Sequence, residues 1–171
     1  MNELNWIAEA RKYIGLCEIK GHQHNPVIQQ WLKDMGSFNQ ENKAWWEDDE
    51  TPWCGLFVAH CLGKTNRFVI KEWFRAQAWA RDDLMTQLNQ PAYGCIAVLT
   101  RTGGGHVGFV VGKNSQNQLL LLGGNQSNQV CIAAFSTHRI TAYYWPSFNQ
   151  YNKPVKSVPL QSRYQLPIVQ T

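Results

Sequence analysis

Hydrophobic positions in the first half of the chain recur every three or four residues, which is the spacing of amphipathic helices. The pattern predicts four helices, over residues 4–15, 26–35, from 54 onward and about 71–84. Asn25 and Pro26 suit the N-cap and first helical positions of the second helix, and Gly36 marks its end. The polar residues 37–52 predict a surface loop before the third helix.

From Ala92 the pattern changes to short apolar runs that are typical of β-strands. These runs predict strands over residues 94–100, 106–112, 118–122, 130–134 and 140–145. Residues 112–117 predict a hairpin connection between two of them. Helices followed by antiparallel strands indicate an α+β fold, with N-terminal helices packed on a C-terminal antiparallel β-sheet.

The end of the chain differs in composition from the rest. Residues 146–171 hold four of the seven prolines and no acidic side chain. We therefore predict a tail over residues 147–171 without regular structure, with Val155, Leu160 and Ile168 as possible anchors on the core. Residues 1–146 are long enough for one hydrophobic core, so they are predicted to form a single domain.

Composition narrows the classes of partner. Of the 171 residues 44% are hydrophobic and eight are Trp, which is ample for a packed interior. The formal net charge is +4, with Lys and Arg scattered rather than gathered in a stripe, so nucleic acid is not an expected partner. A mild positive charge suits a polyanionic surface such as a cell wall, and it equally suits ordinary solubility. No apolar run approaches the roughly 18 residues that cross a bilayer, and no membrane partner is expected.

The N-terminus and the cysteines bear on the compartment. Residues 1–6 lack the basic and apolar regions of a secretory signal, so we expect synthesis in the cytoplasm without Sec export. Five cysteines are an odd number without the spacing of a disulfide framework, which suits a reducing compartment. Four of them fall in or beside apolar runs and are predicted core residues: Cys17, Cys61, Cys95 and Cys131.

Cys54 is the candidate nucleophile. Residues 52–59 predict a turn that opens directly into a buried helix, with Cys54 at its start. Unpaired backbone N–H groups and the positive end of the helix dipole favour thiolate over thiol at that position. The competing interpretation, a small buried residue on an apolar helix, is the more frequent role of a cysteine in general.

A base and an orienting group follow downstream. Three glycines precede His106 at the start of an apolar strand and allow close approach of the chain to another group, which favours a general base over a structural histidine. Asn125 follows two glycines at a predicted strand end and is the candidate third member, although Gly-Gly-Asn is also a good turn. The order Cys54, His106, Asn125 is that of a papain-like triad.

Four residues are candidate substrate contacts because they lie next to the catalytic candidates: Asp49, Glu50, Trp53 and Gln126. The acidic run at 47–50 is either a solvated loop or part of the substrate cleft, where it would contact a free amino group.

A metal or cofactor is not predicted. His22 and His24 have a spacing that can present two ligands, but a third ligand at helpful spacing is missing from the sequence.

Three segments together resemble the CHAP family of cysteine, histidine-dependent amidohydrolases/peptidases, relatives of NlpC-type papain-like cell-wall enzymes. The segments are residues 49–54, 105–108 and 123–126. The resemblance implies a papain-like α+β fold and maps the nucleophile, base and orienting group onto Cys54, His106 and Asn125. Some relatives carry an acidic residue where this chain has Gly123, so orientation of the histidine would rest on Asn125, with Gln126 as a possible substitute.

The function implied by this resemblance is hydrolysis of an amide bond in peptidoglycan, as an N-acetylmuramoyl-L-alanine amidase or a stem or cross-bridge endopeptidase. The enzyme would act in the periplasm or cell wall, as a phage lysin or as a secreted antibacterial effector with a cognate immunity protein. Two alternatives remain open: a deamidase or transamidase that acts on protein, and an inactive wall-binding or phage structural protein.

Overall fold

The computed structural model describes residues 2–19, 25–35, 53–81, 83–101, 104–159 and 165–170. Its described helices are α1 (Asn5–Arg11), α2 (Pro26–Asp34) and α4 (Cys54–Lys64), which confirm three of the four predicted helices. The side chain of Asn25 accepts a hydrogen bond of 2.9 Å from the backbone N–H of Val27, so the predicted cap of α2 is also confirmed. None of the helices in these ranges is long and apolar enough to cross a membrane.

The predicted helix over 71–84 is wrong. The segment forms turns and the short 3₁₀ helix η2 (Ala76–Trp79). The backbone carbonyl of Trp73 accepts a hydrogen bond of 3.0 Å from the indole N–H of Trp79, whereas in an α-helix it would bind the backbone N–H four residues on. Burial of Trp73 and Trp79 thus fixes a compact turn where apolar spacing alone indicated a helix.

Six antiparallel strands form one sheet in the order β1-β6-β2-β3-β4-β5. Their bounds are β1 (Thr86–Leu88), β2 (Ile96–Arg101), β3 (Gly104–Lys113), β4 (Leu119–Gln126), β5 (Gln129–Phe135) and β6 (Ile140–Trp145). The 3₁₀ helix η3 (Thr137–Arg139) joins β5 to β6. The five predicted strands are confirmed, and β1 is an addition at the sheet edge. Helices and an antiparallel sheet together are compatible with the expected α+β class.

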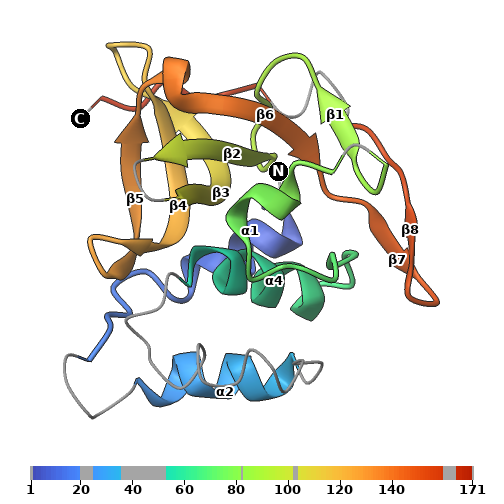
Figure 1. Cartoon of the computed structure of the whole chain (residues 1–171). Coiled ribbons are helices and arrows are strands. Elements are labelled where there is room, and N and C mark those ends of the chain that lie inside the picture. Colours follow the sequence, from blue (N-terminus) through green and yellow to red (C-terminus); the bar gives the residue numbers. More distant parts are fainter. Residues whose placement is uncertain are drawn as a thin grey trace.

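The helices lie on one side of the sheet in Figure 1, with α4 next to the strands and α2 farther away. Aromatic side chains connect these layers. Phe57 of α4 meets Phe109 of β3 at 6.4 Å between ring centroids, and Trp31 of α2 meets Phe57 at 5.9 Å. The nine residues from Cys54 to Leu62 are all buried, so α4 is the central helix of the core.

The tail is more regular than predicted. β7 (Phe148–Gln150) and β8 (Lys153–Val155) form a hairpin, and the guanidinium of Arg67 lies 3.9 Å from the ring centroid of Phe148. Ile168 forms a parallel bridge with Lys113 through backbone hydrogen bonds, although its side chain is exposed. Leu160, another predicted anchor, lies outside the described residues.

Candidate active site

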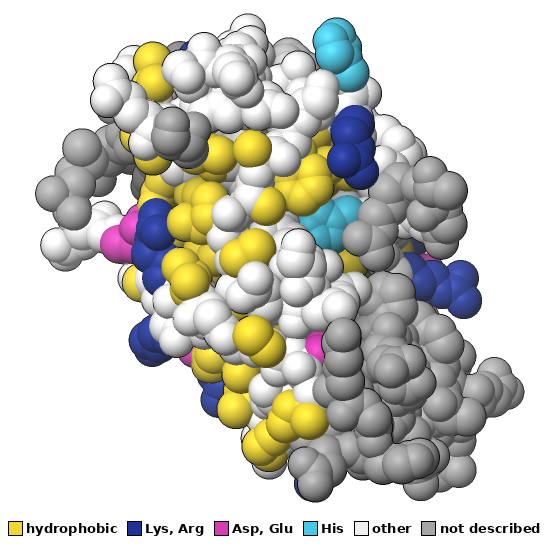
Figure 2. All heavy atoms as spheres, turned by 90° about the vertical axis from the view of Figure 1, so that its left-hand side faces the viewer, with side chains coloured by type: hydrophobic (Ala, Val, Ile, Leu, Met, Phe, Trp, Pro, Cys, Tyr) yellow, Lys and Arg dark blue, Asp and Glu magenta, His cyan; other side chains and the backbone are white. Residues whose placement is uncertain are grey.

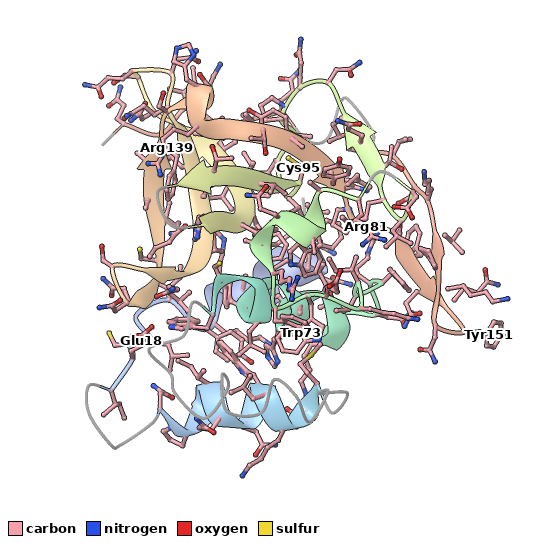
Figure 3. The ribbon with its side chains drawn as sticks, in the orientation of Figure 1. Glu18, Trp73, Arg81, Cys95, Arg139 and Tyr151 are labelled. Carbon is pink, nitrogen blue, oxygen red and sulfur yellow. The ribbon has the colours of Figure 1, made fainter. Side chains whose placement is uncertain are left out.

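Cys54 is the first residue of α4, as predicted, and its side chain is buried. Trp53 is the N-cap residue and supplies no side-chain hydrogen bond to the helix end. The backbone N–H groups of the first turn and the helix dipole favour a negative charge at this position. Gly55 lets the backbone carbonyl of Trp73 lie directly against the helix, where a Cβ would collide with the carbonyl oxygen. Figure 3 shows Trp73 beside α4.

Trp53 lies in the interior rather than in an open cleft. Its side chain is 2% exposed, and its indole N–H donates a hydrogen bond to the Glu18 carboxylate. The backbone N–H of Glu18 in turn donates to the carbonyl of Asn128, in the turn between β4 and β5. Glu18 is labelled below that turn in Figure 3. Trp53 therefore connects the start of α4 to this turn, a placement different from the substrate contact expected for it.

His106 is the third residue of β3 and is buried. Its ring stacks on Phe135 of β5 at a centroid distance of 5.5 Å and an interplanar angle of 24°. Its Nε2 atom lies 2.9 Å from Oε1 of Gln126, the last residue of β4. The ring is thus held on one face by Phe135 and at one nitrogen by Gln126.

The orienting contact expected of Asn125 is made by Gln126. Gln126 is 5% exposed and its amide is engaged on all sides, whereas Asn125 is only partly buried and its side chain makes no hydrogen bond with any described residue. Asn125 has a left-handed backbone with φ +54°, and the pairing of β4 with β5 shifts between Gly123 and Gln126. This irregularity brings the side chain after Asn125 onto the histidine.

Two successive glycines of β4 lie close to the start of α4 and to His106. A Cβ on Gly124 would lie 2.6 Å from the Trp53 ring and 2.7 Å from Cβ of Phe57. A Cβ on Gly123 would lie 3.4 Å from Nε2 of His106. Neighbouring residues of one strand thus touch the first turn of α4 and the His106 ring. In Figure 1 one end of α4 likewise lies close to the turn between β4 and β5.

The model of the CHAP domain family matches residues 46–125. These residues belong to the CHAP family. CHAP domains are generally amidases or peptidases, and membership points to hydrolytic activity related to peptidoglycan. Neither the comparison with curated proteins nor the one with solved structures gives a match.

The CHAP match contains Cys54, His106 and Asn125 and ends one residue before Gln126. The predicted substrate contacts Asp49 and Glu50 lie outside the described residues. Phe135 is a site residue that sequence reasoning missed. It lies on β5, 29 positions from His106 along the sequence, so only the strand pairing brings the two rings together.

The other cysteines of the CHAP domain and its surroundings are less suited to nucleophilic chemistry. Burial raises the pKa of the Cys61 thiol and raises that of Cys95 to about 12, so both stay protonated at neutral pH. These two confirm the predicted core role. Cys17 is exposed and Cys131 is half-buried, so the core prediction is wrong for Cys17.

The part of the chain that the structure describes contains no group of three or more His, Cys, Asp or Glu side chains that could hold a metal ion. His22 and His24, the pair weighed for metal binding, lie outside those residues.

Proposed function

We propose that this protein is a peptidoglycan hydrolase that cleaves an amide bond through the thiolate of Cys54, with His106 as general acid and base. The observation that carries the proposal is the placement of Cys54 at the first turn of α4, where Trp53 and Phe57 pack on Gly124 while the adjacent Gly123 meets His106. A nucleophile at a helix start, packed against an antiparallel sheet that bears the base, also supports a papain-like arrangement.

The reaction would proceed in two steps. The thiolate attacks the amide carbonyl carbon, the C–N bond breaks as the His106 imidazolium protonates the leaving nitrogen, and a thioester forms on Cys54. Water then gives a proton to the neutral imidazole and attacks the thioester, which releases the acid and regenerates the thiol. The backbone N–H groups at the start of α4 are suitable donors to the oxyanion of each tetrahedral intermediate.

The surface near β5 fits a polymer that carries anionic peptides. Figure 2 shows hydrophobic side chains across this face with several Lys and Arg side chains, while acidic side chains of described residues are few there. The guanidinium of Arg139 lies 5.6 Å from the ring centroid of Phe135, which belongs to β5. We place the site of action in the periplasm or cell wall, with the protein acting as a phage lysin or a secreted effector.

The test is digestion of purified sacculi by the wild type and Cys54→Ala, with released muropeptides identified by mass spectrometry. Cys17→Ser is the matched control, because Cys17 is exposed and lies outside the site. We expect the wild type and the control to release the same products and Cys54→Ala to release none. Stem peptides without sugar would identify an amidase, and separated cross-links would identify an endopeptidase.

Equal digests from the wild type and a folded Cys54→Ala, on sacculi of several chemotypes, would contradict the proposal. Release of ammonia from protein glutamine by the wild type in that case would identify the protein-directed deamidase instead.

A further inference from the structure

The side-chain amide of Gln126 is enclosed by three hydrogen-bond partners. Its Nε2 donates to the backbone carbonyls of Leu121 and Cys131, at 3.1 and 2.7 Å. Its Oε1 lies 2.9 Å from Nε2 of His106. With both amide protons on carbonyl oxygens, every polar atom of the side chain has a defined role.

The two carbonyls determine which way the amide faces. A rotated amide would place its oxygen against two other carbonyl oxygens, neither of which can donate a proton. The oxygen therefore faces His106, and an oxygen of this kind can only accept a hydrogen bond. Nε2 of His106 must carry the proton, in the neutral ring as in the cation, so Nδ1 is the atom that gains and loses a proton.

We propose that Gln126 is the positioning residue of the active site: it holds His106 with Nε2 protonated and thereby assigns the general-base role to Nδ1. The inference rests on the proposed function, because it concerns how the same histidine serves Cys54. In a thiolate mechanism the third residue holds the imidazole in one orientation and one tautomer.

The local sequence makes room for this contact. A Cβ on Gly123 would lie 2.5 Å from Oε1 of Gln126, which is closer than real Cβ contacts allow. A side chain at position 123 and the observed position of the Gln126 amide therefore exclude each other. Gly123 and the left-handed Asn125 together let Gln126 reach back to His106 from the end of β4.

The first test needs no substrate. Ring N–H signals of His106 are recorded by NMR on the ¹⁵N-labelled full chain, assigned by comparison with His106→Gln. A proton bonded to Oε1 exchanges slowly with water, so we expect a protected Nε2–H signal in the wild type. We expect Gln126→Leu to lose that protection. Asn125→Gly keeps the left-handed backbone accessible and should retain the signal.

Two further variants keep the test decisive if Gln126→Leu does not fold. Gly123→Ala displaces the Gln126 amide without removing it, and should also lose the protected signal. Gln126→Glu keeps an oxygen that accepts from the Nε2–H of His106 but cannot donate to the carbonyls of Leu121 and Cys131 when it is ionised. Its Nε2–H signal should therefore persist, because a carboxylate accepts this bond at least as well as an amide oxygen.

The second test measures alkylation of Cys54 by iodoacetamide against pH, in a Cys17→Ser background. A displaced imidazole supports the thiolate less well, so we expect Gln126→Leu to react more slowly at neutral pH and to reach half-maximal rate at higher pH. On sacculi we expect kcat to fall at least about tenfold with KM changed less than about twofold, as for loss of an orienting group.

The outcomes separate this inference from the proposed function. Loss of Nε2–H protection and slower alkylation in Gln126→Leu or Gly123→Ala support it even if sacculi are not digested. Persistence of the protected signal in folded Gln126→Leu, with an unchanged alkylation profile, overturns it even if Cys54-dependent digestion is observed. Loss of the signal in Asn125→Gly alone would assign the positioning role to Asn125.

Discussion

At the scale of single residues, glycines decide how closely the parts of the site approach one another. Gly55 admits the Trp73 carbonyl to the first turn of α4, and Gly124 admits the Trp53 ring and Phe57 to the surface of β4. Each contact uses the space that a Cβ would fill, so packing at the nucleophile depends on the absence of side chains as much as on their presence.

Gly124→Ala should destabilise the fold at this point. The new Cβ would lie 2.6 Å from the Trp53 ring and 2.7 Å from Cβ of Phe57, and both groups are buried. Overpacking of this kind costs about 1–3 kcal/mol. We expect the urea midpoint of Gly124→Ala to fall, with the unfolding slope unchanged.

Gly63→Ala is the matched control for this substitution. Gly63 lies near the end of α4, and its Cβ would meet only Cγ2 of Val69 at 3.7 Å, an ordinary contact. Replacing a helical glycine by alanine there should raise stability by up to about 1 kcal/mol. Equal stability of the two variants would show that the Trp53 ring and Phe57 do not pack against Gly124 as closely as in the structure.

At the scale of elements, a partly buried chain of polar side chains joins α1 to α4 beneath α2. His60 of α4 lies with Nε2 2.9 Å from the hydroxyl of Tyr13, which donates to Glu9 of α1 at 2.9 Å. Trp31 of α2 stacks on the His60 ring at 4.7 Å. Burial raises the pKa of Tyr13 to about 12, with Glu9 acting in the same direction, so the hydroxyl stays protonated.

His60 should make stability sensitive to acid. Burial lowers its pKa from 6.5 to about 4; Lys64 acts in the same direction, and Glu9 and Asp34 oppose it. The unfolded chain therefore takes up the proton first, and stability present above pH 6.5 is lost as pH falls toward 4. Between pH 7.5 and 5 the loss from this residue amounts to about 2 kcal/mol.

The measurement is urea unfolding at both pH values for the wild type and His60→Gln, whose amide can still donate to Tyr13. The variant should be less stable at pH 7.5, because it lacks the stacked ring, but should lose less stability on acidification. An equal acid-induced loss in both proteins would mean that His60 is not the group that titrates.

The same elements indicate what sequence can and cannot predict. The run of β-branched and aromatic residues at 140–145 was sufficient to predict the bounds of β6. β1 has only three residues and no fully buried one, so no pattern marks it. The segment at 71–84 has the apolar spacing of a helix. Burial of the Trp79 indole and its hydrogen bond to the backbone carbonyl of Trp73 stabilise a turn there instead.

In the candidate site, too, some features are marked by the local sequence and others depend on tertiary contacts. The helix start at Cys54 and the glycines before His106 are local signals, and the sequence is sufficient to find them. The exchange of Asn125 for Gln126 depends on a positive φ and a shifted strand register, which place a neighbouring side chain on the histidine. No local propensity determines which of two adjacent amides will reach a ring 20 positions earlier in the chain.

At the scale of the whole molecule, β3 bears the candidate catalytic His106 near one end and contacts the C-terminal segment at the other. His106 lies near its start, and Lys113 is its last residue. Seven steps along the strand separate the two residues by about 23 Å. At the far end the N–H of Lys113 donates to Pro167 at 3.0 Å, and its carbonyl accepts from Val169 at 2.9 Å. The last described segment thus extends the sheet away from the active site.

Removal of residues 165–171 should therefore lower stability without lowering the rate of hydrolysis per folded molecule. Two backbone groups of Lys113 lose their partners, which costs about 1–3 kcal/mol. Ile168→Ala is the control, because its side chain is 66% exposed and the backbone pairing would remain, so its stability should match the wild type. Urea unfolding and sacculus digestion, performed at a temperature where all three proteins are folded, measure the two effects. A large fall in kcat for the truncated chain would contradict the separation, since it would mean that packing at Lys113 reaches the catalytic end of β3.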